Sequence, residues 1–144
     1  MKIDDKLLIS LMEQAEASPR KRMNLDLRTS PEDNSQRMLN ALLPGTEVPI
    51  HRHPMSNENV ICLTGSLEEV LYEEVPADMP DEEDVLVAGK VRLREKERYL
   101  LDPHSHHFGI VVPAGVWHTV NVIAPSVIYE AKDGKYGEDE SESI

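Results

Sequence analysis

At 144 residues, the chain has the size of one domain and is long enough to bury a single core. Its formal net charge of −12 argues against nucleic-acid binding and against docking on an anionic membrane, because both need a basic face. One Trp, one Phe and four Tyr leave the core mainly to Val, Ile and Leu, which pack well on a pleated sheet.

The first residues do not have the pattern of a targeting signal. The start MKIDDKLLISLMEQ carries acidic residues where a signal peptide needs a basic start and a long apolar run. No stretch approaches the roughly 18 to 20 apolar residues that cross a bilayer. The single cysteine, Cys62, cannot form an internal disulfide. We therefore expect a cytoplasmic protein.

The first segment has the pattern of an amphipathic helix that ends at Ser18-Pro19. Apolar residues recur at three- and four-residue spacing on one face, namely Ile3, Leu7, Leu8, Leu11 and Met12. A basic cluster follows, with Arg20, Arg22 and Arg28 before a turn at Ser30-Pro31. These arginines either clamp a phosphate or carboxylate of a substrate or simply flank the end of the helix, where cations are favoured.

From Leu42 onward, short apolar runs alternate with turn signals at intervals of about ten residues, which is typical of an all-β sandwich or barrel. We expect strands at 58–64, 69–75, 85–93, 108–112, 118–123 and 126–132. Residues 38–43 form either a strand, which we favour, or a short helix. Cys62 alternates with Glu58 and Val60 and is predicted to face the interior. The acidic stretch 68–84 predicts a solvated hairpin, and residues 137–144 an acidic tail of low order.

Four residues form a candidate metal site. On an extended strand His51 and His53 point the same way, because residues two apart share a face. A turn at 54–57 lets Glu58 begin a strand that returns beside them. His118 begins another strand directly after the Pro113-Ala114-Gly115 turn. An isolated HxH pair is often incidental, so the prediction depends on the whole frame of residues 45–65 around it.

Imidazoles combined with one carboxylate suit a first-row transition ion better than calcium or magnesium. Such a site is open, with room for water or substrate, unlike a thiolate-rich structural zinc site. We therefore expect one divalent ion, namely Zn, Fe, Mn or Ni.

The spacing around these residues resembles the cupin superfamily. Residues 45–65, GTEVPIHRHPMSNENVICLTG, reproduce its first motif: Gly, five residues, HxH, four residues, Glu, six residues, Gly. The second motif is partly present in PAGVWHTVN; His107 replaces the Gly expected six residues before Pro113, and Asn121 lies one residue closer to His118 than usual. The resemblance implies an all-β, single-domain cupin, a double-stranded β-helix or jelly-roll barrel with a short N-terminal helix, and His51, His53, Glu58 and His118 as metal ligands.

Three further segments, SPRKRMNLDLR, SQRMLNALLPGTEVPIHRH and VIYEAKDGKYG, resemble the WbuC family of cupin metalloproteins. The resemblance covers most of the chain and divides it into a helix packed on the barrel (1–19), a barrel (20–136) and the tail (137–144). WbuC-like genes are associated with bacterial O-antigen and surface-polysaccharide clusters, which implies activated-sugar chemistry.

Three other residues are candidates for catalysis. His106 and His107, in DPHSHHFG, supply either a fifth ligand or a general base, or they belong to a plain surface loop. Tyr129 lines the cavity or packs in the core.

Three functions follow from these patterns. The first is a metal-dependent isomerase or epimerase of a sugar, sugar phosphate or nucleotide sugar, in which the metal is a Lewis acid. The second is an Fe(II)-dependent oxygenase, and the third is a non-catalytic carbohydrate-binding cupin. Because cupin-like barrels commonly pair through sheet edges, the expected assembly is a homodimer.

Overall fold

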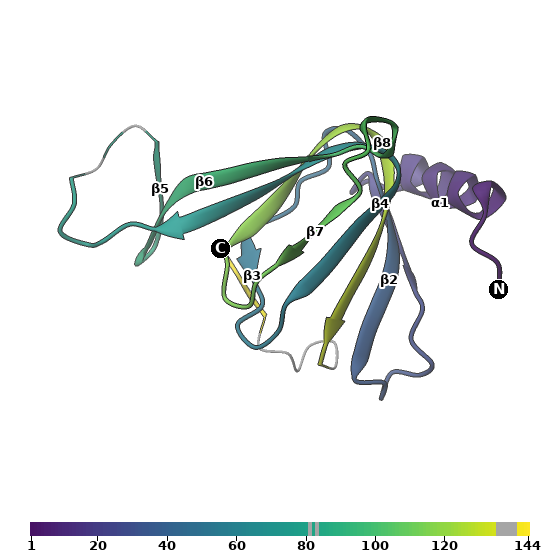
Figure 1. The fold of residues 1–144 in the computed structure, drawn as a ribbon, viewed down its shortest axis with the longest axis horizontal. Coiled ribbons are helices and arrows are strands. Elements are labelled where there is room, and N and C mark those ends of the chain that lie inside the picture. The colour runs from purple at the N-terminus through teal and green to yellow at the C-terminus, as the bar shows by residue number, and fades with distance from the viewer. Residues whose placement is uncertain (81, 83, 135–140) are drawn as a thin grey trace.

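The protein is all-β apart from one long helix (Figure 1). The structure is a computed structural model that describes residues 1–80, 82, 84–134 and 141–144. The elements are α1 (Asp5–Ala17), β1 (Arg22–Asp26), β2 (Ser35–Leu42), β3 (His51–Arg52), β4 (Glu58–Glu74), β5 (Val85–Ala88), β6 (Val91–Leu101), the 3₁₀ turn η1 (Pro103–Ser105), β7 (Gly109–Val112), β8 (His118–Asp133) and β9 (Glu142–Ser143).

The strands form one antiparallel sheet that curls on itself (Figure 1). Its order is β1-β2-β8-β4-β6-β5, while β7 pairs with β4 and β3 pairs with both β8 and β9. The long strands β4 and β8 pair along most of their length. One half of β4 also pairs with β7 and the other half with β6, so the bend between the halves closes the structure. The predicted all-β architecture with an N-terminal helix is confirmed.

The predicted strand breaks at Gly65 and Pro125 are wrong, because the chain bends there without leaving the sheet. The register of β4 against β8 shifts several times between Cys62 and Leu67, as in β-bulges. Gly65 has φ +97, and a Cβ there would lie 2.3 Å from the carbonyl oxygen of Pro125. The position therefore needs glycine both for its left-handed backbone and for the close approach of the other strand.

Helix α1 covers the outer face of β2 and β8. Its buried residues Leu8, Leu11 and Ala15 pack in one cluster with Leu39, Ala41 and Val127. The Asp4 carboxylate caps the helix by accepting a hydrogen bond from the Leu7 N–H at 3.1 Å. The predicted amphipathic helix is confirmed, although Ile3 lies before its first turn and is exposed.

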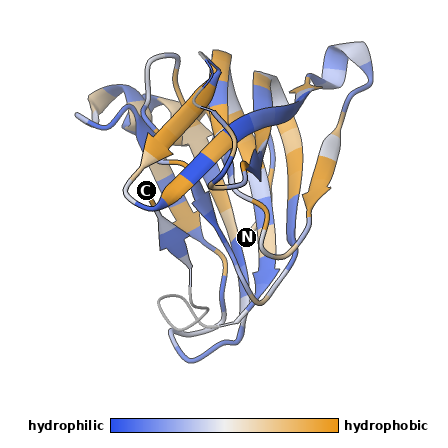
Figure 2. Cartoon of the chain, turned by 90° about the vertical axis from the view of Figure 1, so that its left-hand side faces the viewer, coloured by the Kyte–Doolittle hydropathy of each residue, from blue (hydrophilic) through white to orange (hydrophobic). Residues whose placement is uncertain are grey.

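A second cluster fills one end of the interior, where hydrophobic residues alternate with hydrophilic ones along the strands (Figure 2). It contains Cys62, as its alternation predicted, together with Leu42, Val60, Leu67, Leu101, Val122 and Ile128. Beyond Val60 on β4 and Ile128 on β8, the next inward positions are Glu58, Glu130 and Lys132. The other end of the interior is therefore polar.

Two other boundaries differ from expectation. The single strand predicted at 85–93 is two strands, β5 and β6, because Gly89 takes a left-handed conformation (φ +61) and reverses the chain. The arginine-rich segment after α1 contains β1, which was not predicted. The β5–β6 end of the sheet extends away from the barrel (Figure 1). Residues 81 and 83 of the acidic hairpin lie outside the described residues.

The described end of the acidic tail is ordered against the sheet, contrary to expectation. β9 pairs with β3, and the Arg52 guanidinium lies 2.8 Å from the Glu142 carboxylate. The Ile144 N–H donates to the Ile50 carbonyl at 2.9 Å. Residues 137–140 of the tail and residues 135–136 of the predicted barrel lie outside the described residues. Among the described residues, no helix is long and apolar enough to cross a membrane.

Candidate metal centre

The four predicted ligands converge at the polar end of the barrel. His51 on β3 lies directly opposite His118 at the start of β8, His53 follows β3, and Glu58 begins β4. One ligand atom from each residue lies within 4.8 Å of the others. The predicted convergence is confirmed, and it joins segments that are up to 67 positions apart in the sequence because β3 and β8 are neighbours in the sheet.

The group is compact and shielded from water. The Glu58 carboxylate lies 2.7 Å from His53 Nε2 and 3.8 Å from His118 Nε2. The rings of His51 and His118 have centroids 4.2 Å apart. His53, Glu58 and His118 are buried, and His51 is half-buried. Such close imidazoles and a carboxylate are costly to bury unless a cation or hydrogen bonds compensate them.

Backbone carbonyls orient two of the imidazoles. Nδ1 of His51 lies 2.8 Å from the Pro49 carbonyl, and Nδ1 of His118 lies 3.0 Å from the Val116 carbonyl. An Nδ1–H that donates to these carbonyls leaves Nε2 with a free lone pair, as in metal-binding histidines. Nε2 of His118 is buried and has no hydrogen-bond partner among the described residues. An unpaired buried lone pair beside a carboxylate fits a metal ligand.

The electrostatics favour the forms that bind metal. Burial, with the neighbouring His118, lowers the pKa of His51 to about 4, so its imidazole is neutral at neutral pH. Burial alone would raise the pKa of Glu58, but the imidazoles of His118 and His53 outweigh it and hold the pKa below its ordinary value. Neutral imidazole and ionised carboxylate are the ligand forms that a divalent ion needs. The donor set of three histidines and one glutamate fits a transition ion with open positions.

A cavity of about 480 Å³ lies beside these ligands. Its walls are inward-facing residues of β1, β2, β4 and β8 and the segment before β1, and include Arg20, Arg22, Asn24, Asn40, Glu69, Glu130 and Lys132. The sequence analysis did not single out Asn40, Glu69, Glu130 or Lys132. Their signal was available, because polar residues at inward positions of a β-strand require an explanation.

Two carboxyl groups in the cavity favour their protonated forms. Burial, followed by the charges of Glu58 and Glu130, raises the pKa of Glu69 well above its ordinary value. Burial and the charge of Glu58 raise the pKa of Glu130 to about 8, although Lys132 and a hydrogen bond with Asn40 act in the opposite direction. Nζ of Lys132 lies 3.2 Å from Nδ1 of His53, which is also 2.7 Å from Ser141 Oγ. The cavity therefore combines a proton-holding carboxyl with a nearby ammonium.

The other predicted site residues are divided between this cavity and other places. Arg20 and Arg22 line the cavity, whereas Arg28 is paired with Asp26 at 2.8 Å elsewhere on the sheet. His106 and His107 are exposed in the loop after η1, and neither lines the cavity.

Tyr129 points to the other face of β8 and packs against the α1 cluster. Of the two roles that the sequence left open for Tyr129, this position corresponds to packing in the core and not to lining the cavity.

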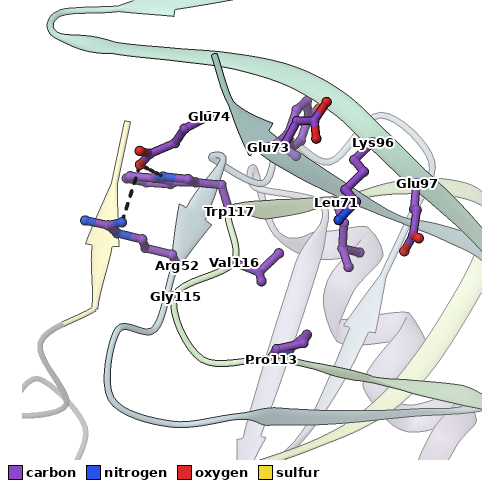
Figure 3. Close-up of a pocket in the computed structure, with 11 residues that line it drawn as sticks. Arg52, Leu71, Glu73, Glu74, Lys96, Glu97, Pro113, Gly115, Val116 and Trp117 are labelled. Carbon is purple, nitrogen blue, oxygen red and sulfur yellow. Dashed lines mark hydrogen bonds and ion pairs between the residues drawn. The ribbon is translucent and has the colours of Figure 1, made fainter. Parts of the chain in front are cut away.

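A second pocket, of about 470 Å³, lies on the other side of β3 (Figure 3). There the Arg52 guanidinium lies 4.6 Å from the centroid of the Trp117 ring, and Trp117 Nε1 donates to the Glu74 carboxylate at 3.1 Å. Arg52 and Trp117 therefore point away from His53 and His118, because adjacent residues of a strand face opposite ways. These contacts hold the short strand β3 against β8 and so support the ligands on its other face.

Comparison with known proteins places the chain in a family. Residues 3–81 match the family model described as "Domain of unknown function (DUF6016)". The chain belongs to this family. Among curated proteins, nothing matches this DUF6016 member.

Solved structures share the fold at low sequence identity. An oxalate oxidase in complex with the substrate analogue glycolate is 12% identical, with a TM-score of 0.58 over 89% of this chain and 57% of that chain. CapF with the inhibitor 3-isopropenyl-tropolone is 14% identical, with a TM-score of 0.58 over 84% and 31%. TT1209 from Thermus thermophilus is 24% identical, with a TM-score of 0.55 over 93% and 98%. The oxalate oxidase and CapF are cupins, so the DUF6016 member has a cupin fold. It spans little more than half of the oxalate oxidase chain.

Removing one ligand tests the metal centre. We expect His118→Ala to lower metal affinity at least about tenfold, because it deletes a buried nitrogen donor. Metal content after dialysis against graded chelator, measured by mass spectrometry, provides the comparison. His106→Ala is the matched control and should retain the same metal content as the wild-type protein. Equal retention by both variants would contradict the assignment of His118.

The raised pKa of Glu130 predicts a pH dependence of stability. A carboxyl whose folded pKa lies above its unfolded value stabilises the fold at low pH and loses this contribution as the pH rises towards about 8. In metal-free protein, Glu130→Gln should therefore lessen the fall in unfolding free energy between pH 6.5 and 8, by on the order of 1 kcal/mol per pH unit. Urea denaturation measures the slope. Glu13→Gln, on the exposed face of α1, should leave it unchanged.

Proposed function

We propose that this chain is a metal-binding cupin of the WbuC type that acts on a sugar, sugar phosphate or nucleotide sugar in surface-polysaccharide metabolism, by isomerisation or epimerisation. The observation that carries the proposal is the cavity, in which the His51, His53, Glu58 and His118 cluster lies with a proton-holding carboxyl and two arginines. A cavity of about 480 Å³ is of the size that takes a small molecule.

The cluster would hold one divalent ion, and the ion would supply a Lewis acid that polarises a carbonyl or hydroxyl oxygen of the ligand. The chain's own contribution is proton transfer. Burial is the main cause of the raised pKa of Glu130, so this carboxyl can hold a proton, as a general acid requires, even where a bound ion neutralises the charge of Glu58. Lys132 lies close enough to the cluster to help neutralise charge on the ligand.

Arg20 and Arg22 are the proposed binding residues for an anionic group. Their guanidinium groups bind a phosphate or carboxylate in a bidentate manner. This attraction matters because the net charge of −12 otherwise repels an anionic ligand. Arg28 is left out of the proposal because its guanidinium is already paired with Asp26. His106, His107 and Tyr129 are also left out, because none of them lines the cavity.

Two other functions have an observation in their favour. The open positions around a histidine and carboxylate site, and the oxalate oxidase among the structures with this fold, favour an Fe(II) oxygenase. The exposed positions of the histidines after η1 favour a carbohydrate-binding module without catalysis, since they leave fewer acid–base groups at the cavity.

Turnover assays separate these functions. Protein loaded anaerobically with Zn, Mn, Ni or Fe is incubated with sugar phosphates and nucleotide sugars, and products are analysed by NMR. We expect isomer formation that falls at least about a hundredfold in Glu130→Gln, because the proton-transfer group is lost. Oxygen uptake by the iron form alone would indicate the oxygenase. A thermal shift with ligand but no product would indicate the binding module.

Arg22→Ala refines the same assay. It should raise KM for phosphorylated substrates at least about tenfold while changing kcat less, because Arg22 binds the anion rather than the reacting centre. Arg28→Ala, outside the cavity, is the matched control. Equal effects of the two substitutions would remove Arg22 from the proposed site.

We also propose a cytoplasmic homodimer. Exposed apolar side chains support an interface on β4 and β7, where Ile61 and Val111 lie on the same face of the ladder. Val111→Glu should shift a dimer towards monomer in sedimentation velocity, because a charge in an apolar interface is costly. Ile9→Glu, an exposed apolar residue of α1, is the matched control. A monomeric wild type at tens of micromolar would overturn the dimer.

A further inference from the structure

Besides Nε2 of His118, two side-chain oxygens of the cavity walls lack a hydrogen-bond partner within the described part of the chain. They are Oε2 of Glu69 and Oδ1 of Asn40. Glu69 is only 1% exposed, and both residues line the cavity beside the metal cluster. Glu69 on β4 lies opposite Val120 on β8, and Val120 is the next inward position after His118. Asn40 on β2 lies opposite Ile128 on β8.

These unpaired acceptors destabilise the fold on their own. A buried polar atom without a partner costs free energy, and native proteins keep few of them. Glu69 is not among the four residues whose ligand atoms converge as a metal site. The outer-face neighbour Glu68, in contrast, is paired with Arg98 at 3.2 Å and with Asn121 at 2.8 Å. Oε2 of Glu69 and Oδ1 of Asn40 are therefore explained by a ligand whose groups form hydrogen bonds with them.

The surrounding charges select the kind of donor. An ammonium group on the ligand would be attracted by Glu58 and Glu130 but repelled by Lys132, Arg20 and Arg22 on the walls of the same cavity, and by any divalent ion in the cluster. Neutral hydroxyl groups meet no such repulsion and can donate to both a carboxyl and an amide oxygen. We propose that Glu69 and Asn40 form a hydroxyl-recognising subsite that selects a polyhydroxylated ligand over an apolar one carrying the same anion. This inference rests on the proposed function and adds which residues form hydrogen bonds with the sugar hydroxyls.

Selectivity of this kind has a known physical basis. A ligand without hydroxyls leaves the buried acceptors unpaired and is rejected, whereas a ligand that donates to them recovers the cost of their burial. The subsite would share one cavity with the metal cluster and the arginines, so it would bind the hydroxyls of the same ligand.

Binding measurements test the selection. Zinc-loaded protein is titrated calorimetrically with glucose 6-phosphate and with hexyl phosphate, which carries the same anion but no hydroxyls. We expect wild type to prefer glucose 6-phosphate at least about tenfold, and Glu69→Leu to lose that preference while still binding hexyl phosphate. Glu68→Leu is the matched control and should retain the preference. If Glu69→Leu does not fold, Glu69→Met, which keeps the length of the side chain but has no hydrogen-bonding oxygen, should lower the preference at least about threefold.

A second measurement needs no ligand. Because Glu69→Leu removes an unpaired buried carboxyl, it should raise the Tm of ligand-free zinc-loaded protein by about 2–4 °C. A lower Tm together with an unchanged sugar preference would overturn the subsite and make Glu69 structural.

The outcomes separate this inference from the proposed function. If wild type prefers the sugar phosphate and the folded Glu69 variant does so equally, the subsite is wrong and the proposed sugar chemistry stands. If wild type binds both phosphates equally, the subsite is overturned while phosphate binding remains. If wild type binds zinc but neither phosphate, both the subsite and the sugar-phosphate assignment are overturned.

Discussion

The pairing of β4 with β8 is the constraint on which the rest of the structure depends. These two long strands are neighbours in the middle of the sheet order, and their ladder continues through the bulges near Gly65 and Ser126. Because the ladder bends without breaking, Glu58 at the start of β4 and His118 at the start of β8 reach the same end of the barrel. β3 then adds to β8 with His51 opposite His118. The ligand cluster is thus a consequence of sheet register.

The same ladder explains why the interior is divided into two halves. Inward positions near the bend carry Val60, Cys62 and Ile128, which pack as an apolar core and stabilise the fold. Inward positions away from the bend carry Glu58, Glu130 and Lys132, whose burial costs free energy unless they are paired. A divalent ion bound by the cluster would reduce the repulsion among these carboxylates and lower their pKa values. Metal binding and the protonation of Glu130 are therefore coupled through charge.

The sequence predicted what depends on local spacing. The period of α1, the inward direction of Cys62 and the convergence of the four ligands all follow from helical or strand periodicity combined with one motif. Boundaries at Gly65 and Pro125 failed because these residues mark turns in many proteins but bulges in a continuous ladder, and only the partner strand decides between them. β9 carries almost no local signal, since two residues pair with β3 through backbone groups and the Arg52–Glu142 ion pair.

The cavity residues show a different limit of sequence reasoning. Glu69 lies in a stretch rich in acidic residues, so charge alone suggests a solvated hairpin and hides a carboxyl group that points inward. The alternation with Leu67 and Leu71, both buried, was the signal that distinguishes it from Glu68. For His106 and His107 the error is the opposite one, since they were predicted as site residues but do not line the cavity. Their residue type alone suggested a site role, whereas they are exposed in a loop. In a barrel built on one bent ladder, side chains alternate between the interior and the outside along each strand. Whether a residue occupies an inward position therefore predicts better than its chemical type alone whether it belongs to the site.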